Sequence, residues 1–137
     1  MTEPESIRLT DELSQLADQL GREFLVKFLE VETSRHPDNV VALAELGHVY
    51  TREGRHEDGL KVDRMLVRLL PADPTVHYNL ACSLALSGRP DDALDALERS
   101  VQLGYSDPDF MLGDDDLASL HGEVRFTAIV DALVQQA

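Results

Sequence analysis

Cysteine is nearly absent from this sequence, which has Cys82 alone among its 137 residues. A single cysteine cannot form a disulfide within the chain, and this favours a reducing compartment. A chain of this length can nevertheless bury enough apolar surface to form one domain without disulfides or metals. Because Cys82 lies in an apolar stretch, we expect its thiol to be buried and unreactive.

Long apolar runs are missing as well. No stretch approaches the roughly 20 consecutive apolar residues that a membrane-spanning helix requires. The first six residues are acidic and polar, which is not the pattern of a secretory signal. Together with the single cysteine, these absences predict a cytoplasmic protein.

Positive charge is also scarce. The chain has only two lysines, Lys27 and Lys61, and its formal net charge is −14. An acidic surface repels phosphate backbones and anionic lipids, so we predict that neither nucleic acid nor a membrane is a partner. The charge is compatible with a basic protein partner, but a surface that is simply well hydrated is the favoured interpretation.

The strongest positive signal is an internal repeat with a period of 34 residues. When the sequence is shifted by 34 positions, helix-ending residues fall on helix-ending residues and apolar residues fall on apolar residues. The aligned pairs include Pro37 and Pro71, Leu46 and Leu80, Gly54 and Gly88, Asp58 and Asp92, Leu60 and Leu94, and Val67 and Val101. Such agreement predicts two complete units, at residues 40–73 and 74–107.

Each unit has the pattern of two amphipathic helices joined by a short turn. Gly54 and Gly88 follow the first helices, where a residue with positive φ is often needed. Pro71 ends a second helix, and the pair Asp73-Pro74 suits the cap and first position of the next helix. The sequence therefore predicts an all-α chain of antiparallel helical hairpins.

The register extends weakly beyond the two units. Residues 6–39 are predicted to form a degenerate hairpin that breaks near Gly21. Residues 108–137 are predicted to form a C-terminal cap, which covers an apolar face that would otherwise meet water. We thus expect residues 1–137 to form a single domain of about three hairpins plus the cap.

The two complete units resemble tetratricopeptide repeats (TPRs), on residues that match the signature of that family. The first supplies Leu43, Leu46, Gly47, Tyr50, Gly59, Leu66 and Pro71, and the second supplies His77, Leu80, Ala81, Leu84, Ala93, Leu97 and Ser100. The resemblance is to small bacterial TPR proteins, and it implies a right-handed α-α superhelix. The chain departs from the family pattern at Asp63, His77 and Tyr105.

In this family the first helices of successive units line a concave groove that receives a peptide or a partner helix. By position, the resemblance implies a groove that also includes Ala44, Ala85 and Leu86, for which packing against neighbouring helices is the alternative. The predicted partner-binding residues of this groove are Val41, Glu45, His48, Thr51, Arg52, Thr75, Tyr78, Asn79 and Cys82. The expected function is protein–protein interaction, with a partner segment that is basic or apolar. Some family members clamp a C-terminal carboxylate, but Ala44 and His48 stand where that clamp needs a Lys and an Asn, so we predict no such binding.

Two other functions compete with this reading. The five histidines form no metal-binding pair of known spacing, and the acidic run Asp114-Asp115-Asp116 lacks the pattern of a calcium loop. We therefore predict no catalytic residue, no metal and no cofactor. Self-association as a scaffold, or as a homodimer, is the second alternative, because the apolar residues between Phe24 and Val31 cover more than one helix face.

Overall fold

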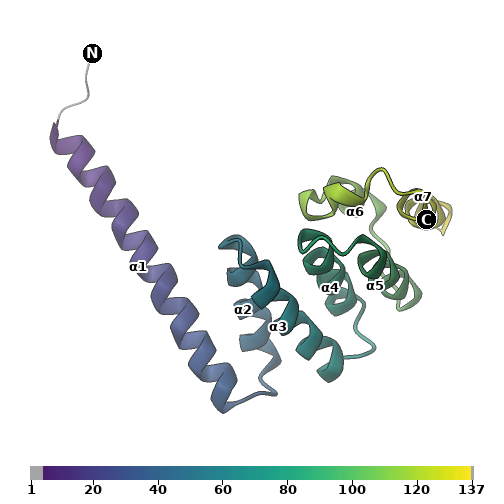
Figure 1. Cartoon of the computed structure of the whole chain (residues 1–137), viewed down its shortest axis with the longest axis horizontal. Helices are drawn as coiled ribbons and strands as arrows, with labels where there is room; N and C mark the ends of the chain where they lie inside the picture. Colours follow the sequence, from purple (N-terminus) through teal and green to yellow (C-terminus); the bar gives the residue numbers. More distant parts are fainter. Residues whose placement is uncertain (1–4, 137) are drawn as a thin grey trace.

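The computed structural model describes the backbone of residues 5–136 and the side chains of residues 12–136. Within this part of the chain every regular element is a helix. The elements are α1 (Glu5–Arg35), α2 (Val40–Arg52), α3 (His56–Leu69), α4 (Pro74–Leu86), α5 (Pro90–Gln102), α6 (Pro108–Gly113), the 3₁₀ helix η1 (Asp115–Leu120) and α7 (Val124–Gln136). Figure 1 shows α1 projecting from one end of the stack and α6 and α7 closing the other. The predicted all-α fold is confirmed.

The two central hairpins, α2–α3 and α4–α5, follow the 34-residue register. Gly54 and Gly88 have φ values of 74° and 73°. This left-handed conformation suits glycine, which has no Cβ to collide with the backbone. After each glycine the chain closes the helix with the same bond: the Arg55 amide donates to the Tyr50 carbonyl at 2.8 Å, and the Arg89 amide donates to the Leu84 carbonyl at 2.9 Å.

Helix starts repeat with the same period. The side chains of Asn39, Asp73 and Asp107, each 34 residues from the next, accept hydrogen bonds from backbone amides in the first turns of α2, α4 and α6. Such side chains satisfy amides that have no partner within the helix. The start of α6 therefore follows the same rule as the starts of the two complete units.

Small residues let the helices approach closely, as the signature implies. A Cβ added to Gly47 would lie 3.4 Å from a Val62 side-chain atom. Ala81 and Ala93 are completely buried within the core that α4 and α5 share. Ser100, also completely buried, donates from its hydroxyl to the Pro74 carbonyl at 2.7 Å and so ties α5 to the start of α4.

The prediction of a hairpin at residues 6–39 is wrong, because α1 is one continuous helix of 31 residues. Gly21 lies inside α1 with no atom within 4 Å of its added Cβ. A glycine inside a helix costs only about 1 kcal/mol relative to alanine, which a long helix tolerates. Only the C-terminal half of α1 packs on α2, through Val26 and Leu29. The described residues thus contain two complete hairpins rather than three.

Residues 108–136 form the short helices α6, η1 and α7, which cover one end of the stack. Helix η1 contacts α4 and α5, and α7 contacts α5 and α6. Leu117 and Leu120 of η1 are fully buried, and Phe126 of α7 is 2 % exposed. None of the helices in residues 5–136 combines the length and hydrophobicity that crossing a bilayer would need.

Candidate partner-binding groove

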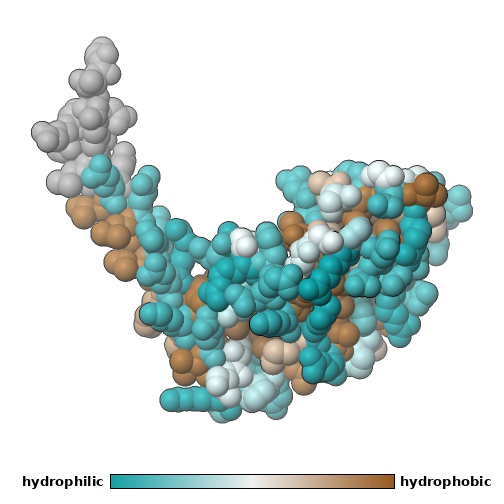
Figure 2. Space-filling model, in the orientation of Figure 1, coloured by the Kyte–Doolittle hydropathy of each residue, from teal (hydrophilic) through white to brown (hydrophobic). Residues whose placement is uncertain are grey.

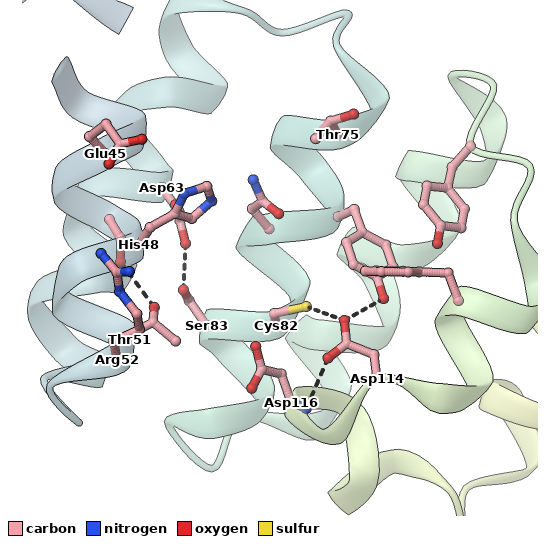
Figure 3. Close-up of a pocket in the computed structure, with 15 residues that line it drawn as sticks. Glu45, His48, Thr51, Arg52, Asp63, Thr75, Cys82, Ser83, Asp114 and Asp116 are labelled. Carbon is pink, nitrogen blue, oxygen red and sulfur yellow. Dashed lines mark hydrogen bonds between the residues drawn. The ribbon is translucent and has the colours of Figure 1, made fainter. Parts of the chain in front are cut away.

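A cavity of about 570 Å³ lies between α2, α4 and the C-terminal cap. Figure 3 shows its walls, with α2 on one side, α4 in the middle and the start of η1 opposite. Its lining residues are Glu45, Gly47, His48, Thr51, Arg52, Asp63, Thr75, Tyr78, Asn79, Cys82, Ser83, Tyr105, Phe110, Asp114 and Asp116. We call this set the groove. It includes every predicted partner-binding residue except Val41, which is 72 % exposed. Ala44, Ala85 and Leu86, which the resemblance also implied, lie outside the lining.

The first wall is one face of α2. Glu45, His48 and Arg52 are three and four positions apart, so they point to the same side of the helix. All three are exposed, whereas the opposite face of α2 is buried in the core. The Thr51 hydroxyl donates to the Gly47 carbonyl of the same helix at 3.0 Å. This wall therefore presents exposed polar side chains to the cavity.

The floor is formed by α4, with Asp63 of α3 behind it. Tyr78 and Cys82 are almost fully buried, while Thr75 is exposed and Asn79 is half-buried. The Ser83 hydroxyl donates to the carboxylate of Asp63, which is 7 % exposed. Burial raises the pKa of Asp63 to about 6, although the Ser83 hydrogen bond and nearby His48 act in the opposite direction.

The second wall comes from the C-terminal cap, and the sequence analysis missed it. The Tyr78 hydroxyl donates to Asp114 Oδ2 at 2.7 Å, and the Asp116 amide donates to Asp114 Oδ1 at 3.0 Å. The ring of Tyr78 stacks on Tyr105 with centroids 4.6 Å apart and meets Phe110 at 5.9 Å. One feature of the sequence indicated this wall. Asp107-Pro108 continues the 34-residue register, so α6 takes the place of the first helix of a next unit.

Negative charge dominates the groove. The lining contains the carboxylates of Glu45, Asp114 and Asp116, and Arg52 is its one arginine. Burial and the neighbouring Asp114 raise the pKa of Asp116. Such a cavity attracts a cationic group more strongly than an anionic one.

The cysteine of the groove is protonated at neutral pH. Burial is the largest cause that raises the pKa of Cys82, and the carboxylates of Asp114 and Asp116 act in the same direction. The thiol contacts Asp114 Oδ2 at 3.7 Å. A thiol without thiolate character is a poor nucleophile. The prediction that Cys82 is buried is confirmed, and its electrostatic surroundings favour an unreactive thiol.

Cys82, Asp114 and Asp116 bring three potential metal-ligand atoms within 4.8 Å of one another. Both oxygens of Asp114 already accept hydrogen bonds, from Tyr78 and from the Asp116 amide. A metal-binding cysteine must also lose its proton, which these surroundings oppose. We therefore interpret the cluster as the bonds that fasten η1 to α4.

Solved structures share this fold, and two of them are similar over most of this chain. One is titled "MamA RS-1 ArsTM double mutant", with a TM-score of 0.63, 17 % identity, and coverage of 88 % of this chain and 70 % of that chain. The other, "MamA MSR-1 C2", has a TM-score of 0.64 and 16 % identity, and the match covers 88 % of this chain and 71 % of that one. No protein-family model matches the chain, and no curated protein matches it significantly. The similarity confirms an all-α, TPR-like repeat fold, and at this identity it carries no function across.

Proposed function

We propose that the protein is an interaction module that binds a polypeptide segment of a partner in the groove. One observation carries the proposal: eight residues chosen from the sequence by repeat position line a single cavity. They come from two helices of successive hairpins, as the concave binding faces of helical repeat proteins do. The cavity is large enough to bury several side chains of a bound segment.

The chemistry of the groove favours a segment that carries both basic and apolar groups. Phe110 is 58 % exposed beside the stacked rings of Tyr78 and Tyr105. An aromatic face of this kind accepts the aliphatic stem and the charge of a lysine or arginine. Asp116 and Glu45 provide carboxylates on opposite walls to pair with that charge. An acidic segment would meet repulsion from the same groups.

A peptide-binding experiment tests the proposal. Fluorescent peptides of equal length and of basic-apolar, neutral and acidic composition would be titrated with the purified chain. We expect saturable binding of basic-apolar peptides that weakens as salt rises, because exposed charge pairs are screened. The double variant Glu45→Lys, Phe110→Ala should reduce that affinity at least tenfold.

A matched control separates the groove from the overall charge of the protein. Asp131→Lys with Val134→Ala makes the same charge change and also removes apolar surface, though less of it, on α7, where both side chains are exposed. This variant should bind the peptides as the unchanged chain does. Equal losses in both double variants, or preference for acidic peptides, would contradict binding in the groove.

The remaining expectations about function stay predictions. The absence of catalytic activity, the cytoplasmic location and the lack of a nucleic-acid or membrane partner follow from the sequence alone. Homodimer formation also stays a prediction at this point.

A further inference from the structure

Between Leu13 and Val31, one face of α1 is apolar and has no partner among the described residues. The side chains on it are each at least 51 % exposed, and they are Leu13, Leu16, Leu20, Phe24, Phe28 and Val31. We call these six residues the α1 stripe. Figure 2 shows apolar surface along this projecting helix. Large apolar side chains exposed in one row mark an interaction surface more often than a monomer surface.

The α1 stripe lies opposite the face that packs on the stack. With 100° of rotation per residue, the buried Val26, Leu29 and Thr33 point about 180° away from the row that contains Phe24 and Phe28. Helix α1 therefore has two apolar faces, of which α2 covers only one.

The repeat register indicates which helix is missing from the uncovered apolar face of α1. Helix α3, a second helix of a complete hairpin, contacts α2, the first helix of its own unit, and α4, the first helix of the next unit. The C-terminal half of α1 holds the second-helix position and contacts α2, yet no first helix covers its other side. Residues 6–20 hold the first-helix position in the register. They do not fold back as a separate helix but form the N-terminal half of α1.

The spacing of the α1 stripe is palindromic. Successive stripe residues are separated by 3, 4, 4, 4 and 3 positions, which reads the same from either end. Two copies that lie antiparallel with a two-fold axis beside residue 22 place Leu13 on Val31, Leu16 on Phe28 and Leu20 on Phe24. A two-fold interface requires this kind of self-complementary surface.

The exposed area matches what a stable dimer needs. Six half-exposed Leu, Phe and Val side chains leave about 700 Å² per copy, or about 1,400 Å² for the pair, against the roughly 1,200–2,000 Å² typical of specific interfaces. The two-fold axis also keeps the hairpin stacks apart, because Arg22 points away from the stripe and pairs with Glu53 of the stack at 3.1 Å.

We propose that the occupant of the α1 stripe is the α1 helix of a second copy of this chain, packed antiparallel. Leucines from the N-terminal half of one copy then cover the phenylalanines of the other. Each copy supplies the first helix that its partner's degenerate repeat lacks, as in an exchange of equivalent elements between protomers. This arrangement is independent of the groove, which lies on the other side of α2.

The oligomeric state of the full chain tests the proposal. Sedimentation velocity across the micromolar range should show a dimer. Leu20→Glu with Phe24→Glu, at the centre of the interface, should give a monomer with an unchanged helical spectrum, because both side chains are exposed in the single chain. Gln15→Glu with Gln19→Glu adds the same charge on the other exposed side of α1 and should remain dimeric. A strictly monomeric unchanged chain, or a dimer insensitive to the stripe variant, would overturn the proposal.

Cross-linking tests the orientation. Phe28→Cys mixed with Leu16→Cys should form a disulfide-linked heterodimer under mild oxidation, whereas Leu16→Cys alone should cross-link poorly. The buried Cys82 is common to all samples, and the unchanged chain serves as the background. Efficient cross-linking of Leu16→Cys to itself would indicate parallel helices and would refute the antiparallel arrangement.

Discussion

The Asp63→Asn substitution should change how the stability of this protein depends on pH. Asp63 is 7 % exposed and lies in the interface between α3 and α4, where its carboxylate accepts a hydrogen bond from Ser83. Its burial raises its pKa from 3.8 to about 6. An asparagine has nearly the same shape and can still accept the Ser83 hydrogen bond, but it never carries the charge.

The sign of the effect follows from proton linkage. Because the pKa of Asp63 is higher in the folded state, the folded chain binds an extra proton between about pH 4 and pH 6. The stabilisation from this protonation is complete below the unfolded pKa and is lost as the pH rises through about 6. The shift corresponds to about 3 kcal/mol over the whole titration, of which about 1.4 kcal/mol falls between about pH 5 and pH 7.5.

Urea unfolding followed by circular dichroism measures this difference. The free energy of unfolding of Asp63→Asn minus that of the unchanged chain should increase by about 1.4 kcal/mol from about pH 5 to pH 7.5. The range avoids the isoelectric point near 4.5. Asp131→Asn, at an exposed position on α7, serves as the control and should show a nearly constant difference. A constant difference for Asp63→Asn as well would refute the reasoning from burial.

Three further substitutions probe the packing. Ala81→Leu should overpack the fully buried α4 core and lower the free energy of unfolding by about 1–3 kcal/mol, so an unchanged melting midpoint would contradict the register. Gly88→Ala should cost about 1 kcal/mol in urea unfolding because φ is 73°, whereas Gly113→Ala, with open space and no positive φ, should cost less. Tyr78→Phe removes the donor to Asp114 and should cost about 1–2 kcal/mol, with faster hydrogen exchange in η1; unchanged exchange there would argue against this bond fastening the cap.

The sequence predicts the hairpins well because their boundaries depend on local chemistry. Gly54 and Gly88 adopt the positive φ expected of residues that end helices. Asp73 caps α4 through its own side chain, as its position before Pro74 indicates. Gly21 shows where this reasoning fails. Glycine permits a turn but does not require one, and the absence of a following proline or capping residue leaves the helix free to continue.

The groove is only half predictable from the sequence. Positions on α2 and α4 follow from helical spacing and the register, and His48 and Asn79 lie in the lining of the cavity. Val41 lies outside the lining, because the cavity does not extend to the first turn of α2. That these residues bind a partner stays a prediction. Phe110 and Asp116 were missed because they lie in the cap, where the repeat has ended and their position depends on how the chain turns back.

The cap also limits how copies of this chain can be joined. Leu117 and Leu120 of η1 are buried and α7 lies on α5, so the chain itself covers the face of α5 on which a further hairpin would pack. In polymer terms, this covered end of the stack is a terminator, and in the proposed dimer the α1 stripe is the reactive end. A unit with one reactive end forms closed pairs and cannot propagate into filaments, however high its concentration.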